Sequence, residues 1–296
     1  MKKKSHTFRS WLYKENVAGY VLAAPFILGF FAFILVPMGM SLYFSFCDYN
    51  ILSPETWVGF KNYARLFSDP KLMNSLKVTL KYAFFSVPLK LLFSLCVALL
   101  LLRNTKATPF YRAVYYVPSI MGASVAVSVL WKQVFTTDGL FNRITGLKVA
   151  WLANTKTAIW ILILLSVWQF GSSMLIFLST LKQVPQELYE AARVDGAGKV
   201  SSFFTITLPL LTSTIFFNLI MQSINGLLVF VQGQIITAGK PMDSTKFYVL
   251  YMYEQAFQFS KAGYASAMGW VMVLLIIAFT VFLFATKKFW VYEGGY

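Results

Sequence analysis

The sequence has few charged residues and almost none of the groups that perform chemistry. Only 12% of its 296 residues are charged, whereas a soluble globular domain carries about a quarter. It has one histidine, His6, and two cysteines, Cys47 and Cys96, which lack any CxxC or CxxH context. A disulfide framework is therefore not expected. The sequence predicts no catalytic residues and no metal site.

Acidic residues are the scarcest charged group, and all of them lie outside the apolar runs. The chain has 11 Asp and Glu against 26 Lys and Arg, which gives a formal net charge of +15. Ion-coupled carriers place ionisable residues inside membrane spans, so an ion-coupled secondary transporter of a small polar solute is the weaker alternative function. A membrane-embedded enzyme is disfavoured by the same lack of carboxylates and histidines. The basic residues are scattered, which argues against nucleic-acid binding.

One basic residue departs from this distribution. Lys90 lies well inside an apolar run. A lone lysine at such a position either extends along the span to place its ammonium group in water or points into the helix bundle. The sequence leaves both placements open.

Long apolar runs are what the sequence has in abundance. Hydrophobic residues make up 58% of the chain, and its mean hydropathy is +0.63. About 20 apolar residues suffice to cross a bilayer as a helix. Six such runs are present, at residues 17–45, 77–102, 111–131, 158–181, 208–232 and 264–286. The first is too long for a signal peptide and lacks its cleavage site. The predicted fold is therefore all-α, a polytopic membrane protein with six transmembrane helices.

The distribution of basic residues predicts which side the two termini face. Six spans place both ends on the same side, and cytoplasmic loops are enriched in Lys and Arg. With the termini inside, the inner segments carry 13 Lys and Arg and the outer segments carry 10. We therefore expect a cytoplasmic segment at residues 1–16, a six-helix domain at 17–290 and a cytoplasmic tail at 291–296. Much of the positive charge would then face anionic lipid.

One polar insert, residues 182–208, interrupts the apolar pattern between the fourth and fifth runs. It contains the string PQELYEAARVDGAGKVSSFFTITLP, which starts at Pro185. Proline suits the first turn of a helix, and Asp195-Gly196 is a turn signal because glycine adopts the positive φ that ends a helix. The insert is interpreted either as an ordinary helical hairpin or as a docking element for a soluble partner.

The same residues form a known motif. They resemble the EAA loop in the membrane subunits of binding-protein-dependent ABC importers. The pattern of that loop is Glu-Ala-Ala, three residues, Gly, nine residues, Ile, one residue and Leu-Pro. The residues assigned to ATPase coupling on this resemblance are Glu190, Ala191, Ala192, Asp195, Gly196, Ile206, Leu208 and Pro209. The strings YFSFCDYN, WVGFKNYARLF, FYRAVYYVPSIMGASVAVSVLWKQVF and DGLFN are similar to the maltose/glycerol-3-phosphate group of these permeases.

The resemblance implies an ABC type I importer permease fold and a heteromeric complex in a bacterial or archaeal cytoplasmic membrane. The chain would translocate a sugar or oligosaccharide by alternating access. Its implied partners are a second homologous permease subunit, two ATPase subunits docked on the EAA loop, an extracytoplasmic solute-binding protein, membrane lipid and the carbohydrate itself. No cofactor is expected in this chain: ATP and Mg²⁺ would bind the ATPases, and no G-x-x-x-x-G-K-[ST] loop is present. The chain is then not an enzyme by itself. A purely structural subunit would have no use for such a docking loop.

The fifth run carries the most polar stripe among the spans. Asn218, Gln222 and Asn225 recur at helical spacing on one face, and Gln232 continues close to that stripe. Neutral amides offer donors and acceptors to sugar hydroxyls, and Trp168 in the fourth run could stack on an apolar sugar face. These residues are the predicted substrate pathway. The equally weighted alternative is that the amides bond across helices and hold the bundle or the heterodimer together.

The predicted topology can be tested by cysteine accessibility. Single cysteines placed within residues 2–9 or 290–296, in a background without Cys47 and Cys96, are expected to react with an impermeant thiol reagent only after the cells are opened. Labelling of either end on intact cells would contradict the cytoplasmic placement of both termini.

Overall fold

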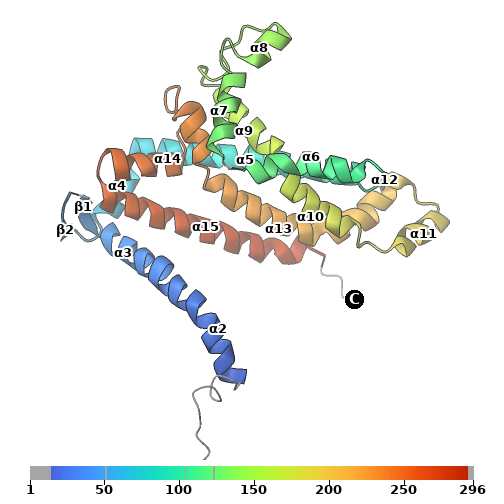
Figure 1. Ribbon diagram of the computed structural model, residues 1–296, viewed down its shortest axis with the longest axis horizontal. Coiled ribbons are helices and arrows are strands. Elements are labelled where there is room, and N and C mark those ends of the chain that lie inside the picture. Colours follow the sequence, from blue (N-terminus) through green and yellow to red (C-terminus); the bar gives the residue numbers. More distant parts are fainter. Residues whose placement is uncertain (1–14, 51, 104, 123, 293–296) are drawn as a thin grey trace, which may run out of the picture. The chain divides into compact units, whose positions relative to one another are not determined.

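A computed structural model describes residues 15–292 of the chain, apart from residues 51, 104 and 123 (Figure 1). Most of the expected cytoplasmic segment 1–16 and of the tail 291–296 therefore lies outside the described residues. The chain divides into two compact units. One contains the residues up to 65 together with 255–270, and the other contains residues 66–254 together with those from 271 onward.

The first unit begins with one long apolar helical run. It consists of α2 (Glu15–Phe30), the π-helical turn η1 (Phe31–Leu35) and α3 (Val36–Ser45). A two-stranded antiparallel hairpin follows, β1 (Cys47–Asn50) and β2 (Ser53–Trp57), and then α4 (Lys61–Ser68). The Asn62 amide donates to the carbonyls of Ser45 and Cys47, at 2.9 and 2.8 Å. It thereby satisfies backbone acceptors where α3 ends.

The segment 46–74, which follows the first apolar run, folds into regular structure. It contains the hairpin, α4 and the start of α5 (Pro70–Leu100). Asp69-Pro70 looks like a turn signal but begins a helix. The Asp69 carboxylate accepts from the backbone N–H groups of Lys71 and Leu72, and proline at the first helical position needs no N–H partner.

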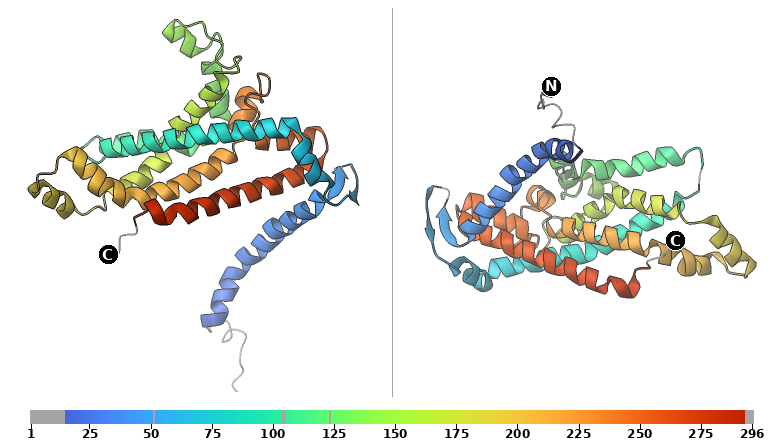
Figure 2. Two further views of the ribbon diagram at one scale, coloured as in Figure 1. Left: turned by 180° about the vertical axis from the view of Figure 1, so that it is seen from behind. Right: turned by 90° about the horizontal axis from the view of Figure 1, so that it is seen from below.

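The second unit is a helical bundle built around α5. In chain order its other helices are α6 (Thr108–Met121), α7 (Val125–Val134), α8 (Leu140–Thr145), α9 (Ala158–Trp168), α10 (Gly171–Leu181), α11 (Gln186–Val194), α12 (Lys199–Ser202), η2 (Phe203–Thr207), α13 (Leu208–Leu227), η3 (Gly233–Thr237) and α14 (Tyr248–Tyr253). The last two elements, η4 (Glu254–Gln258) and α15 (Ala262–Trp290), each include residues of both units. Helix α5 packs against α9, α10, α13 and α14. Helices α11 and α14 lie near opposite ends of the bundle (Figures 1 and 2).

Two apolar clusters flank the middle of α5. One includes Val78 and Tyr82 of α5 together with Ile159 and Leu162 of α9. The other includes Val87 and Leu91 of α5 with residues of α10 such as Met174 and Phe177. The buried hydroxyls of Ser75, Thr79 and Ser94 donate hydrogen bonds to backbone carbonyls of α5 itself. Such small, internally bonded side chains let neighbouring helices approach closely.

The apolar helices agree with six membrane crossings. Four described helical runs, Gly19–Ser45, Pro70–Leu100, Lys199–Leu227 and Ala262–Trp290, are long and apolar enough to cross a membrane. The count becomes six if each of two bent pairs is one span: α6 with α7, bent by 102°, and α9 with α10, bent by 42°. The third and fourth predicted spans each correspond to two helices with a bend between them.

The π-helical turns η1 and η2 each end two residues before a proline. Pro37 and Pro209 are each the second residue of the α-helix that follows. Proline cannot donate to the carbonyl four residues earlier, and its ring clashes with that carbonyl. The wider π turn accommodates this locally, so the helix continues through the proline.

Gly171 sets how closely α10 approaches α6. A methyl group added there would overlap the carbonyl oxygen of Tyr115 and lie 2.7 Å from Cα of Tyr116. We expect Gly171→Ala to destabilise the bundle by about 1–3 kcal/mol, the usual cost of overpacking, which thermal unfolding of the purified protein would report. Gly39→Ala is the control, because nothing lies within 4 Å of its added methyl group. Equal unfolding temperatures for the two variants would contradict this packing.

Candidate functional site

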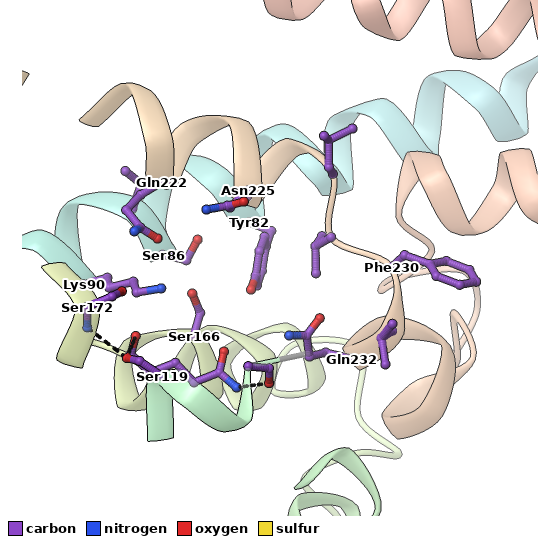
Figure 3. Close-up of a pocket in the computed structure, with 17 residues that line it drawn as sticks. Tyr82, Ser86, Lys90, Ser119, Ser166, Ser172, Gln222, Asn225, Phe230 and Gln232 are labelled. Carbon is purple, nitrogen blue, oxygen red and sulfur yellow. Dashed lines mark hydrogen bonds between the residues drawn. The ribbon is translucent and has the colours of Figure 1, made fainter. Parts of the chain in front are cut away.

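A polar cavity of about 370 Å³ lies in the second unit, beside the central part of α5 (Figure 3). It sits where both broken spans change direction and where α13 ends. Its walls come from α5, α6, α9, α10, α13 and the residues that follow α13. The polar residues among those lining it are Tyr82, Ser86, Lys90, Ser119, Ser166, Gln169, Ser172, Gln222, Asn225 and Gln232.

The two helix breaks satisfy each other's backbone groups. The Gln169 side chain, at the break between α9 and α10, donates from Nε2 to the Gly122 carbonyl at 2.7 Å. Ser119 of α6 donates from Oγ to the Gln169 carbonyl at 3.0 Å and accepts from the Ser172 N–H at 3.0 Å. Backbone groups freed inside a membrane need such partners. The breaks therefore form one hydrogen-bonded wall of the cavity.

Only part of the predicted amide stripe lines the cavity. Gln222 and Asn225 line the cavity from α13, and Gln232 lines it from beyond a break at residues 228–230. Gln222 also donates from Nε2 to Ser173 Oγ of α10 at 3.1 Å. Asn218 does not line the cavity. It is 1% exposed and donates to the carbonyl of Thr214 on its own helix, which is the geometry expected of a packing residue.

Trp168 is also absent from the cavity lining. Its ring centroid lies 5.6 Å from that of Trp131 on α7, while the next residue, Gln169, reaches the cavity. The helix ends at Trp168, so the direction of successive side chains changes there. A proposed sugar-stacking role for Trp168 has no support in this arrangement.

Several lining residues were not selected from the sequence. Tyr82, Ser86, Ser119, Ser166 and Ser172 are single hydroxyl groups within apolar runs, without the regular spacing that marks the amides. A signal did exist for the breaks: Pro118-Ser119 precedes Gly122, and Gln169 stands two residues before Gly171. Polar residues next to helix-disrupting ones indicate where a span is interrupted.

Lys90 points into the cavity. Figure 3 shows its side chain directed toward the space between Ser86 and Ser166. This resolves the alternative left open by the sequence in favour of the bundle interior. Within the described residues Lys90 forms no ion pair, since both salt bridges there belong to Lys246.

Lys246 shows how a partly buried lysine is neutralised elsewhere in the same unit. Its Nζ lies 3.0 Å from Asp243 Oδ1 and 3.1 Å from Glu254 Oε2. Burial by itself would lower the pKa of Lys246, but its hydrogen bonds to Asp243 and Glu254 outweigh burial and raise that pKa above its ordinary value.

The EAA loop folds as an exposed helix with a closed C-terminal turn. Helix α11 has no buried residue. Gly196 has φ +81°, its N–H donates to the Arg193 carbonyl, and the Ala197 N–H donates to the Ala192 carbonyl. This pair of bonds is a Schellman motif, which requires a residue in the left-handed region. The motif thus explains the glycine four residues after the second alanine.

The remaining EAA residues lie where the loop joins the bundle. Glu190, Ala191 and Asp195 are exposed and Ala192 is half-buried; Ile206 lies in η2, and Leu208 and Pro209 begin α13. The Tyr189 hydroxyl forms a 2.8 Å hydrogen bond with Thr207 Oγ1 and so fastens α11 to η2. The loop also exposes Leu188, Val194, Val200 and Phe204. It therefore presents a mixed polar and apolar surface.

Comparison with known sequences agrees with this architecture. Residues 79–289 match the family of binding-protein-dependent transport system inner membrane components. One relative is the probable ABC transporter permease protein YesP of Bacillus subtilis (strain 168), 46% identical over 98% of this chain and 95% of the relative. Another is the sn-glycerol-3-phosphate transport system permease protein UgpA of Pectobacterium atrosepticum, 30% identical over 94% of this chain and 97% of the relative.

Solved structures show the same fold. A bacterial ABC transporter involved in the import of the acidic polysaccharide alginate matches with a TM-score of 0.78, covering 95% of this chain and 98% of that chain. A bacterial alginate ABC transporter in complex with an alginate pentasaccharide-bound periplasmic protein matches with a TM-score of 0.80, covering 95% of each. Both are 21% identical to this chain. The predicted permease fold is confirmed.

The division of the amide stripe leads to a prediction with an internal control. Asn225→Ala is expected to lower solute uptake by the assembled complex about 2- to 10-fold, the loss of one hydrogen bond to a neutral partner, and to leave assembly intact. Asn218→Ala should instead lower the thermal stability of the complex, because Asn218 is buried outside the cavity. Uptake rate and unfolding temperature, measured on both variants, check the assignment. Loss of assembly in Asn225→Ala would favour the interhelical role instead.

Proposed function

We propose that this chain, which belongs to the family of binding-protein-dependent transport system inner membrane components, moves a sugar or oligosaccharide through the polar cavity by alternating access. It is a permease subunit of a binding-protein-dependent importer and is not itself an enzyme. The observation that carries the proposal is the helical run Lys199–Leu227. This run starts at the EAA loop and ends with Gln222 and Asn225 on the cavity wall.

The continuity of that run supports coupling. A displacement of α11 would pass through the Tyr189–Thr207 hydrogen bond into η2 and α13. The exposed face of α11 fits docking by an ATPase subunit, in which Glu190 offers a charged contact and the small Ala191 and Ala192 allow a close approach. ATP and Mg²⁺ would be bound by two such ATPase subunits, outside this chain.

The chemistry of the cavity supports a carbohydrate. Its amides and hydroxyls provide donors and acceptors together, which suits the hydroxyl groups of a sugar. Two relatives are described as an arabinooligosaccharides transport system permease protein and a trehalose/maltose transport system permease protein. A sugar substrate for this chain is therefore consistent with both its own residues and its relatives.

A second permease subunit would complete the pathway. Asn225 lines the cavity and is itself exposed. An amide on a spanning helix needs a polar partner or a water-filled space. A homologous subunit facing α13 would supply it, and an extracytoplasmic solute-binding protein would deliver the sugar. The complex would lie in a bacterial or archaeal cytoplasmic membrane, surrounded by lipid, with both termini in the cytoplasm.

The proposal predicts that transport depends on the left-handed conformation of Gly196. In proteoliposomes holding both permease subunits, the ATPases and the binding protein, uptake should require ATP. Gly196→Val should lower it severalfold, because a β-branched residue at positive φ costs about 1–3 kcal/mol, while membrane insertion persists. Nothing lies within 4 Å of a Cβ at this position, so the effect is conformational and not steric.

Gly196→Asn is the matched control, because asparagine tolerates the left-handed region far better than valine. It should retain most of the uptake. Uptake that ignores ATP and collapses with an ionophore would contradict the proposal and favour an ion-coupled carrier. Equal ATP-dependent uptake by the Gly196→Val and Gly196→Asn variants would contradict a coupling role for the turn.

A further inference from the structure

Lys90 is the single charged residue among the described residues that line the cavity. Its side chain points inward (Figure 3), and no Asp or Glu is among the lining residues that the structure describes. Every other polar group among the described lining residues is neutral. These groups are serine hydroxyls, the phenol of Tyr82 and the amides of Gln169, Gln222, Asn225 and Gln232. The described wall of the cavity therefore carries a net positive charge.

A structural explanation for this lysine is weak. Lys90 lies ten residues before the end of α5 at Leu100, about 15 Å along the helix axis, which is farther than its side chain can reach toward that end of the helix. A buried charge is normally paired. The same unit pairs Lys246 with two carboxylates, whereas no salt bridge reaches Lys90 within the described range.

The surroundings of Lys90 suit an oxyanion. Ser86, Ser166 and Ser172 provide hydroxyls on three different helices around it, and the Gln222 amide lies on a fourth (Figure 3). A lysine ammonium provides the charge, and hydroxyl or amide donors can bond the remaining oxygens of a carboxylate or phosphate. Hydrogen bonds of this charge-assisted kind are stronger than those between neutral groups.

We propose that the cavity accepts sugars that carry an anionic group, a carboxylate or a phosphate, with Lys90 as the counter-charge that selects them. The inference rests on the proposed function, since it names the solute class of the same pathway. Lys90 binds the acidic group, while Asn225 and Gln232 meet the neutral hydroxyls of the sugar. A neutral sugar fits the same space but leaves the ammonium group unpaired.

The test measures binding of sugar probes to the permease complex in nanodiscs. The solute-binding protein is left out, because its own selectivity would mask that of the cavity. Three probes differ only at one terminal C6: cellobiose, its C6 carboxylate and its C6 phosphate. The parent complex should bind one or both anionic probes roughly 10- to 100-fold more tightly than cellobiose, the usual contribution of a hydrogen bond to a charged group. Comparison of the two anionic probes distinguishes a uronate-type solute from a sugar phosphate.

Variants of α5 assign the preference to Lys90. Lys90→Gln should remove the preference without weakening cellobiose binding, and Lys90→Arg should retain most of it. Lys77→Gln is the matched control, because Lys77 is an exposed lysine on the same helix outside the cavity. Size-exclusion chromatography confirms that each complex is assembled.

The inference is overturned if the parent complex binds cellobiose as tightly as the anionic probes, if it binds none of the three, or if Lys90→Gln keeps the preference. The probe series on the parent complex still tests the preference for anionic sugars if Lys90→Gln does not assemble. Failure of the proposed function has a different signature, namely no ATP-driven uptake of any sugar in proteoliposomes. An importer that transports only neutral sugars would retain the proposed function and lose this inference.

Discussion

The structure of the second unit depends on how two broken spans satisfy the backbone groups that their breaks release. Gln169 bonds the Gly122 carbonyl, and Ser119 bridges the Gln169 carbonyl and the Ser172 N–H. Unpaired backbone groups in hydrocarbon cost several kcal/mol each, so neither break would be stable alone. Gly171 permits this pairing by letting α10 start against the backbone of α6. The polar cavity is the consequence, because the groups that close the breaks also form its wall.

The cavity lies along α5 between two apolar clusters. Val78 and Tyr82 belong to one cluster, and Val87 and Leu91 to the other. The residues of α5 that line the cavity are Tyr82, Ser86, Val87 and Lys90, which form a short central part of the helix. On the proposed function, a solute in the cavity would meet amides, hydroxyls and one ammonium group among the described lining residues. On the proposed selectivity, Lys90 would act on the solute directly, because its side chain points into the cavity.

Helix α13 connects this site to the exposed EAA loop. The loop keeps its shape through local bonds, the Schellman pair at Gly196 and the Tyr189–Thr207 hydrogen bond, and not through burial. A surface that holds its shape without being buried is suited to receiving a partner. The π turn before Pro209 keeps α12 and α13 in one helical run, and the proposed coupling would use this run to carry a movement of the loop to Gln222 and Asn225.

The sequence alone determined the class of the protein, the number of apolar runs and the EAA motif with its turn glycine. Each of these depends on residues close together in the chain: run length, helical spacing and the positive φ that Gly196 adopts. Only the tertiary structure decided which polar residues meet. It placed Asn218 outside the cavity that Gln222 and Asn225 line, brought Gln169 and not Trp168 to the cavity wall, and directed Lys90 inward. The physical reason at Gln169 is that side-chain direction changes where a helix breaks, and this break is fixed by a hydrogen bond to Gly122, about fifty positions away. The surroundings of Asn218 and Lys90 are set by which helices pack against α13 and α5, which residue spacing within one helix does not specify.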